Sequence, residues 1–177
     1  MTPRVSGRLV RSFLRYLRER IGEGAYRAYA NNLVVRGELL RNPPARTDWV
    51  ALDDWLKVLE GFEYAYGDRD SMHLLRETTR ATMAVAVQKG WSAFLAEVTP
   101  DQLLARADTF WQMSYDTGQL VVTDRGPHRC RLEIRDWPEV PPAVVASVAE
   151  ACVVFLVRLG ERGARAVDRA NTIEISW

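Results

Sequence analysis

Apolar side chains recur at helical spacing through most of the first half of the chain. Over residues 7–21 they follow one another at intervals of three and four, which predicts an amphipathic helix. Two glycines interrupt the pattern, and a shorter helical piece follows over residues 26–33. We expect Asp48 to cap a helix that ends at Gly61 or continues to Gly67, and a further helix over residues 71–89. The first half is therefore predicted to be all helical.

Alternating patterns, which are typical of strands, replace the helical period farther along the chain. Before this change, a short helix is predicted to begin at Thr99 and Pro100, with Thr99 as its N-cap and Pro100 as its first residue. Residues 110–115 predict a strand with one aromatic and one polar face, and residues 120–123 and 130–135 predict a hairpin. The inward face of the second hairpin arm carries Cys130, Leu132 and Ile134.

The most apolar stretch of the chain covers residues 143–159 and predicts a helix that is apolar nearly all round. Such a helix is expected to lie buried against a sheet rather than on the surface. Residues 164–168 and 172–177 then predict a closing hairpin.

These elements predict an α+β fold in which a helical N-terminal half packs on a C-terminal antiparallel sheet of four to five strands. One buried helix lies between the hairpins. A length of 177 residues fits a single domain. Within it, residues 1–46 form a basic helical N-terminal segment and residues 109–177 the part that contains the sheet.

Charge is unevenly distributed along the chain. Residues 1–46 hold ten arginines and three glutamates, a net charge of +7, and the remainder carries −6, which leaves the overall +1. Four of these arginines form a ridge on the first helix: Arg8, Arg11, Arg15 and Arg18. The ridge could meet phosphates or an acidic protein, or could be a solvated helix face. A protein partner is preferred, since the chain as a whole is nearly neutral.

No apolar run has the length of a membrane span, and no signal-peptide pattern follows the initial Met. The two cysteines, Cys130 and Cys152, lack a Cys-x-x-Cys spacing and are interpreted as small buried hydrophobic residues. We therefore expect a cytoplasmic protein without a disulfide framework.

Catalytic and phosphate-binding motifs are absent from the sequence. The best candidate for an acid–base or metal face is Asp70, His73 and Glu77, which share one side of a predicted helix. The same residues also fit an ordinary helix start, where acidic side chains are favoured. We expect no catalytic site, no metal and no cofactor.

Aromatic residues around the predicted sheet suggest an apolar pocket between helices and strands. Packed core is the alternative interpretation. The candidate lining residues are Trp91, Phe94, Trp111, Met113, Tyr115, Cys152 and Phe155.

The run Asp116-Thr117-Gly118-Gln119-Leu120-Val121-Val122 and the closing Thr172-Ile173-Glu174-Ile175-Ser176-Trp177 resemble an uncharacterised family expanded in myxobacteria. More distantly, the layout is similar to the fold of haem–nitric-oxide sensors, 4-vinyl-reductase-type domains and transport-protein-particle (TRAPP) subunits. That resemblance implies helices on an antiparallel sheet, often a dimer, with an apolar pocket in the ligand-binding relatives. The Tyr-x-Ser-x-Arg signature of the haem sensors is missing here, so His73 is a poor haem ligand. Cys152 also lacks the cysteine cluster of the 4-vinyl-reductase domains.

The function expected from these observations is a non-enzymatic regulatory or scaffolding domain of bacterial signalling. It would bind a protein partner, a small apolar ligand or both, and could form a homodimer. One alternative is an enzyme that uses the Asp70, His73 and Glu77 face. Another is weak nucleic-acid binding by the arginine ridge.

Overall fold

A computed structural model describes residues 2–33, 37–67 and 72–177, and the chain divides into two compact units. The N-terminal unit comprises residues 1–78 and 114–116, and the C-terminal unit comprises residues 79–113 and 117–177. The single domain expected over the whole chain stays a prediction.

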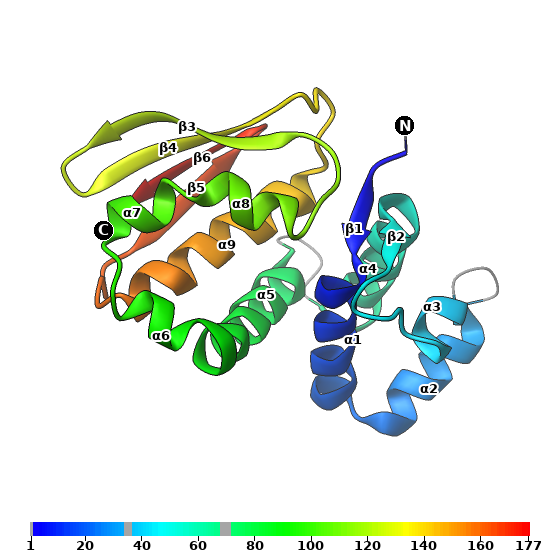
Figure 1. Cartoon of the computed structure of the whole chain (residues 1–177). Helices are drawn as coiled ribbons and strands as arrows, with labels where there is room; N and C mark the ends of the chain where they lie inside the picture. Colours follow the sequence, from blue (N-terminus) through cyan, green and yellow to red (C-terminus); the bar gives the residue numbers. More distant parts are fainter. Residues whose placement is uncertain (1, 34–36, 68–71) are drawn as a thin grey trace. The chain divides into compact units, whose positions relative to one another are not determined.

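The N-terminal unit consists of helices and one two-stranded antiparallel sheet (Figure 1). In chain order its elements are β1 (Arg4–Ser6), α1 (Gly7–Ile21), α2 (Glu23–Asn32), α3 (Gly37–Arg41), β2 (Trp49–Ala51), α4 (Leu52–Tyr66) and the first part of α5 (His73–Ala86). The helix predicted over residues 7–21 is confirmed as α1. Its N-cap is Ser6, whose side chain accepts a hydrogen bond from the Leu9 N–H.

Apolar side chains of α1, α2 and α4 form the core of this unit. Phe62 is fully buried and its ring lies 4.4 Å from that of Tyr29, centroid to centroid. Phe13 of α1 meets Trp55 of α4 edge to face at 5.8 Å. These aromatic pairs hold the helices together by apolar burial and favourable ring geometry.

The prediction that Asp48 caps a helix is wrong. Residues 49–51 form β2, which pairs with β1, and α4 begins only at Leu52. The Asp48 carboxylate instead accepts a hydrogen bond from the Ala45 N–H at 2.7 Å. The first half is consequently not all helical, because pairing with a strand more than 40 residues away overrides the local capping signal.

The C-terminal unit carries a four-stranded antiparallel sheet in the order β3-β4-β6-β5. Its elements are the remainder of α5, η1 (Val87–Trp91), α6 (Ser92–Leu95), α7 (Pro100–Leu104), α8 (Ala107–Gln112), β3 (Gln119–Gly126), β4 (Arg129–Arg135), α9 (Pro142–Arg158), β5 (Arg165–Arg169) and β6 (Thr172–Ser176). The α+β class, the two hairpins and the helix between them are confirmed.

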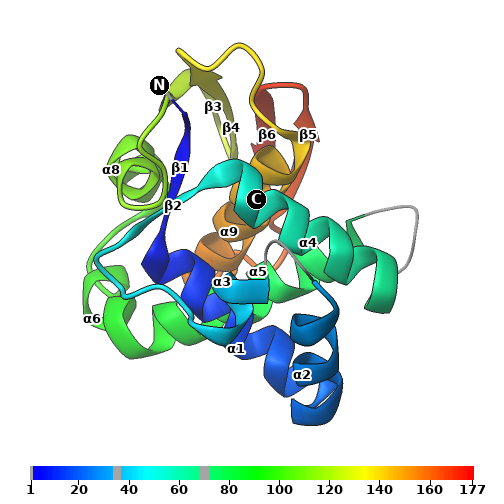
Figure 2. The same ribbon diagram turned by 90° about the vertical axis from the view of Figure 1, so that its right-hand side faces the viewer.

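Helix α9 packs on β5 and β6, as its apolar sequence predicts (Figures 1 and 2). Cys130, Leu132 and Ile134 of β4 are buried, and β4 pairs with β6, where Ile173 and Ile175 are also buried. The period of two therefore identified the inner face of these strands correctly.

The strand predicted over residues 110–115 is wrong, because residues 107–112 form α8. The Asp108 carboxylate lies in the first turn of α8 and accepts hydrogen bonds from the Leu120 N–H, at 3.1 Å, and from the Gln112 side chain, at 2.8 Å. The first bond joins α8 to β3, a contact that local alternation cannot reveal.

The helix predicted over residues 71–89 ends earlier in its regular form. Regular α5 ends at Ala86, and η1 is a π-helical turn that leads into α6. The predicted N-cap at Thr99 is confirmed, with a capping box in which Thr99 and Gln102 exchange side-chain-to-backbone hydrogen bonds. No helix within the described ranges has both the length and the apolar character to cross a bilayer.

Candidate functional site

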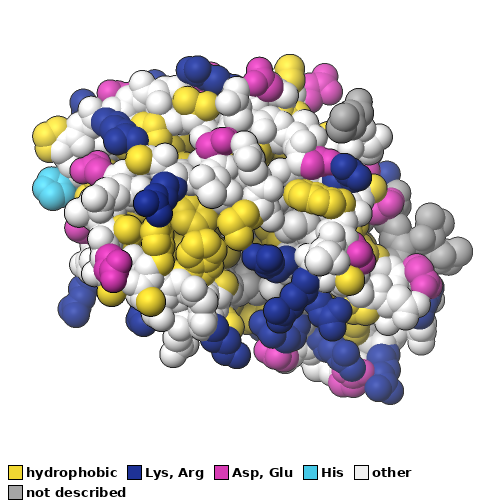
Figure 3. All heavy atoms as spheres, in the orientation of Figure 1, with side chains coloured by type: hydrophobic (Ala, Val, Ile, Leu, Met, Phe, Trp, Pro, Cys, Tyr) yellow, Lys and Arg dark blue, Asp and Glu magenta, His cyan; other side chains and the backbone are white. Residues whose placement is uncertain are grey.

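A partly exposed apolar surface covers one hydrophobic cluster of the C-terminal unit. The buried members of the cluster are Val87, Leu95, Leu103 and Phe155. The half-buried side chains packed against them, which we call the aromatic surface, are Met83, Trp91, Phe94, Val98, Phe110, Val154 and Leu159. Figure 3 shows hydrophobic side chains gathered over this part of the unit, next to a cationic side chain.

The rings of the aromatic surface form a continuous chain across three elements. Trp91 lies 5.9 Å from Phe94 and 5.1 Å from Phe110, measured between ring centroids. Phe110 in turn lies 5.3 Å from Phe155 of α9. Rings that touch in this way lose little further freedom when a ligand packs on them, which makes the surface preorganised for an apolar body.

Trp91 occupies a special backbone position, since it is the last residue of the π-helical turn η1. Such turns are rare and occur frequently at functional sites. Here the turn ends at the residue whose ring contacts both Phe94 and Phe110.

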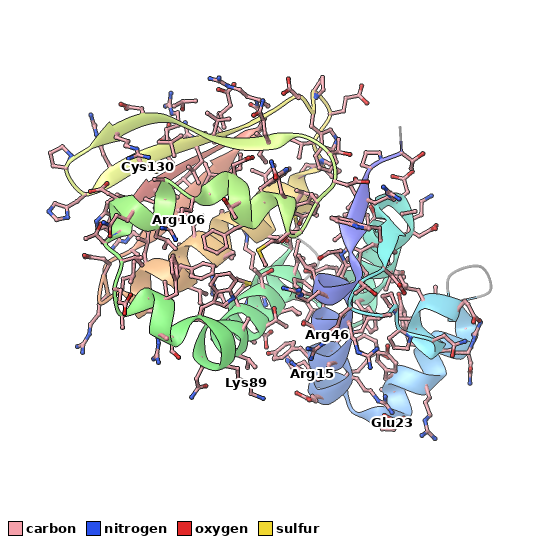
Figure 4. All side chains as sticks on the ribbon, viewed as in Figure 1. Arg15, Glu23, Arg46, Lys89, Arg106 and Cys130 are labelled. Carbon is pink, nitrogen blue, oxygen red and sulfur yellow. The ribbon has the colours of Figure 1, made fainter. Side chains whose placement is uncertain are left out.

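The cationic residue Arg106 borders the aromatic surface. The guanidinium carbon of Arg106 lies 5.1 Å from the centroid of the Phe94 ring, a cation–π contact. Figure 4 labels Arg106 where α7 leads into α8, beside aromatic side chains. The site thus combines an apolar layer with the exposed positive charge of Arg106.

The structure brings three of the predicted pocket residues together, namely Trp91, Phe94 and Phe155. The others are placed elsewhere or add no ring to this surface. Trp111 packs against Trp137 at 6.1 Å and donates a hydrogen bond to the Thr117 carbonyl. Met113 is 39% exposed, Tyr115 belongs to the N-terminal unit, and Cys152 lies on α9.

Phe110 and Arg106 are functional candidates that the sequence analysis missed. The alternation over residues 110–115 places Phe110 on the polar face of a predicted strand. Residues 106 and 110 are four apart in the sequence, and in a helix this spacing places two side chains on the same face. This spacing is the sequence signal that could have identified the two residues as neighbours.

Both thiols lie in surroundings that disfavour the thiolate. Burial raises the pKa of Cys130 to about 11 and that of Cys152 to about 12. Since the thiolate is the reactive form, neither side chain is suited to act as a nucleophile at neutral pH. Among the described residues, no group of three histidine, cysteine or acidic side chains is arranged to hold a metal ion.

The four arginines predicted to form a ridge are all exposed on α1. Arg18 forms an ion pair with Glu23, and Arg11 donates a hydrogen bond to the Pro44 carbonyl. Within the described part of the chain, Arg8 and Arg15 form no ion pair. Figure 4 labels Arg15 on α1, with Arg46 nearby in that view. Half of the ridge is therefore available to a partner.

The proposed acid–base face of Asp70, His73 and Glu77 is only partly visible. Asp70 lies outside the described residues, and His73 is exposed. The Glu77 carboxylate accepts hydrogen bonds from the Tyr16 hydroxyl, at 2.8 Å, and from Arg20, at 3.0 Å. These partners occupy Glu77 in a structural contact between α1 and α5, and the catalytic use of the face stays a prediction.

Glu77→Gln is expected to weaken the protein most at neutral pH and less in acid. The Tyr16 hydrogen bond, followed by that of Arg20, lowers the pKa of Glu77 against the opposing effect of burial. Its contribution is thus present above the ordinary glutamate pKa of about 4.3 and is lost as the pH falls through the lower folded-state value. Urea unfolding at pH 7, 4 and 3 measures this.

Glu19→Gln removes one exposed negative charge from α1 and serves as the control. A destabilisation by Glu77→Gln that stays constant from pH 7 to pH 3 would contradict the assigned role of the Glu77 carboxylate.

No protein-family model and no curated protein matches this sequence. The resemblance to the myxobacterial family therefore finds no support. Several solved structures do match. An Fe(II) unliganded H-NOX protein from K. algicida has a TM-score of 0.68 at 10% identity, over 96% of this chain and 94% of that one. An oxygen-binding H-NOX domain related to soluble guanylate cyclases has a TM-score of 0.65 at 9% identity, over 97% and 94%.

A third structure, from work on haem distortion in the H-NOX family, has a TM-score of 0.70 at 10% identity, over 97% of this chain and 94% of that one. The chain therefore shares the H-NOX fold. At this level of identity the likeness concerns the fold alone.

The residues of this chain do not fit haem, which the names of these solved proteins mention. Haem iron is held by histidine, thiolate, tyrosinate or a methionine beside a histidine. His73 is exposed on α5, and His128 is exposed at the turn between β3 and β4. Burial raises the pKa of both thiols and of Tyr115, so these groups are protonated at neutral pH in the metal-free protein.

Proposed function

We propose that this protein is a non-enzymatic regulatory domain that binds a small apolar ligand on its aromatic surface, without haem. The observation that carries the proposal is the chain of half-buried rings formed by Trp91, Phe94 and Phe110. Contiguous apolar surface that stays partly exposed on a folded protein often marks a site of recognition. The fold supports the proposal, because related structures with this fold are named for haem, itself a flat and largely apolar ligand.

The ligand would pack against the rings and displace water from them. Trp91 and Phe110 would contribute the largest flat area, and the buried Phe155 beneath Phe110 would hold that ring in place. At roughly 0.3 kcal/mol for each non-hydrogen atom, an apolar ligand of about 17–23 such atoms is expected to bind with a Kd of about 10–200 μM.

Titration with N-phenyl-1-naphthylamine, a neutral fluorescent probe, tests the proposal. The unaltered protein should bind the probe with a Kd in that range, and Trp91→Leu should weaken binding about tenfold because it removes the central ring. Trp49→Leu replaces a tryptophan that is 40% exposed in the N-terminal unit, and it should leave binding unchanged.

Equal loss in the two tryptophan variants, or no binding by the unaltered protein, would refute the proposed site. A separate experiment tests the proposal that the protein binds no haem. After incubation with haemin and gel filtration, the protein should carry no stoichiometric haem absorption, and a stoichiometric band would overturn that proposal.

A signalling role through a protein partner belongs to the same proposal. Arg8 and Arg15 support it, because their guanidinium groups are exposed and unpaired within the described residues. Such groups favour an acidic partner surface and association that weakens with salt. A homodimer and a cytoplasmic, bacterial setting complete the proposal.

A further inference from the structure

We infer that Arg106 makes the aromatic surface selective for apolar ligands that carry one anionic group, such as a carboxylate or sulfonate. The inference rests on the proposed function, since it adds a chemical class to the ligand of the same surface. Its basis is the position of the Arg106 guanidinium at 5.1 Å from the Phe94 ring centroid.

Backbone hydrogen bonds fix the position of the Arg106 Cα, from which the side chain extends. The backbone N–H of Arg106 donates a hydrogen bond to the Leu103 carbonyl at 3.0 Å, and the backbone carbonyl of Arg106 accepts one from the Phe110 N–H at 3.3 Å. Arg106 therefore joins the end of α7 to the start of α8. Its two backbone partners are Leu103, a buried member of the hydrophobic cluster, and Phe110, which belongs to the aromatic surface. Because the backbone at Arg106 is already fixed, less entropy is lost when the side chain binds a ligand.

The charge of Arg106 is not neutralised within the protein. Among the residues that the structure describes, Arg106 takes part in no ion pair. The nearest carboxylate along the chain, that of Asp108, accepts the Leu120 N–H and the Gln112 side chain instead. The guanidinium thus keeps its hydrogen-bond donors for a ligand.

Stacking on a ring leaves the edge of a guanidinium free, and that edge carries five N–H donors in a planar fork. The fork matches a carboxylate or sulfonate in a bidentate arrangement. A ligand packed on the Phe94 ring would shield its contact with the exposed Arg106 guanidinium from part of the water, so the attraction would act in a lower dielectric than on an open surface. One end of the site would hold the anion and the rings would hold the apolar body.

Two naphthalene probes that differ in one anionic group test the inference. 1-Anilinonaphthalene-8-sulfonate carries a sulfonate, and N-phenyl-1-naphthylamine has the same ring system without it. The unaltered protein should bind the sulfonate about tenfold more tightly. Arg106→Gln should remove this preference and leave the Kd of the neutral probe unchanged. Arg106→Lys should restore part of it, since lysine keeps the charge and loses the fork.

Lys89→Gln is the matched control, because it removes an exposed cation of η1, which Figure 4 labels at the outer edge of the same unit. It should leave both affinities unchanged. Equal affinity for the two probes in the unaltered protein, or an equal effect of the two glutamine variants, would overturn the selectivity while the binding surface stands. Loss of both probes in Arg106→Gln would overturn it as well and assign Arg106 a structural role. If the unaltered protein binds neither probe, the proposed function itself fails.

Discussion

Phe62→Ala is expected to lower the free energy of unfolding by about 3–5 kcal/mol. Phe62 is fully buried in the N-terminal unit, and its ring contacts those of Tyr29, Tyr26 and Tyr66 at centroid distances of 4.4, 6.1 and 6.1 Å. Removing the ring leaves a cavity that α2 and α4 cannot fill without moving three aromatic side chains. Equilibrium unfolding in urea, followed by circular dichroism, measures the loss.

Two further substitutions on α4 keep this prediction decisive if the alanine variant fails to fold. Phe62→Leu retains most of the buried volume and should cost only about 1–2 kcal/mol. Tyr64→Ala removes a side chain that is 74% exposed, and it should change the free energy of unfolding by about 0.5 kcal/mol or less. Similar losses for the substitutions at Phe62 and Tyr64 would show that the packing around Phe62 is not as described.

Gly7→Ala is expected to destabilise the N-terminal unit by about 3 kcal/mol. An added Cβ would lie 2.2 Å from the Ala45 carbonyl oxygen and 3.1 Å from that of Asp48. Because both atoms belong to the backbone, the segment from Ala45 to Asp48 would have to move. That movement would also break the 2.7 Å hydrogen bond from the Gly7 N–H to the Asp48 carbonyl.

Gly24→Ala provides a control of the opposite sign. Gly24 lies in α2, and an added Cβ there would meet no atom within 4 Å. Alanine is favoured over glycine in a helix, so this variant should gain about 0.5–1 kcal/mol. The pair is compared by thermal and urea unfolding under the same conditions. If Gly7→Ala is as stable as Gly24→Ala, the close approach of the Ala45 segment to α1 is contradicted.

The ligand hypothesis and these stability predictions concern different parts of the molecule. Phe62 and Gly7 belong to the N-terminal unit, whereas Trp91, Phe94 and Arg106 belong to the C-terminal unit. A variant that loses probe binding without a change in its unfolding curve would therefore support recognition by the rings and the guanidinium, separately from folding.

Elements whose formation depends on neighbouring residues were predicted well. Helix α1 has a regular apolar stripe, an N-cap at Ser6 and an end at Gly22, which has a φ of 83°. The capping box at Thr99 and the alternation in β4 likewise act within a few residues. In α9 the continuous apolar sequence itself requires burial, whatever covers it.

Elements that depend on distant contacts were not predictable in this way. The alternation over residues 110–115 fits a strand locally, but the Asp108 carboxylate bonds the Leu120 N–H and secures α8 against β3. Asp48 has the composition of an N-cap, yet pairing of β2 with β1 delays the helix to Leu52. In both cases an interaction between residues far apart in the chain outweighs a weak local preference.

The candidate site shows the same division. Trp91, Phe94 and Phe155 were identified from their aromatic or apolar character alone. The roles of Phe110 and Arg106 depend on α8 being a helix and on its N-cap residue, Arg106, contacting the ring of Phe94 in α6. Composition and periodicity report which side chains avoid water, whereas the meeting of one charge with one ring is settled by packing between separate elements.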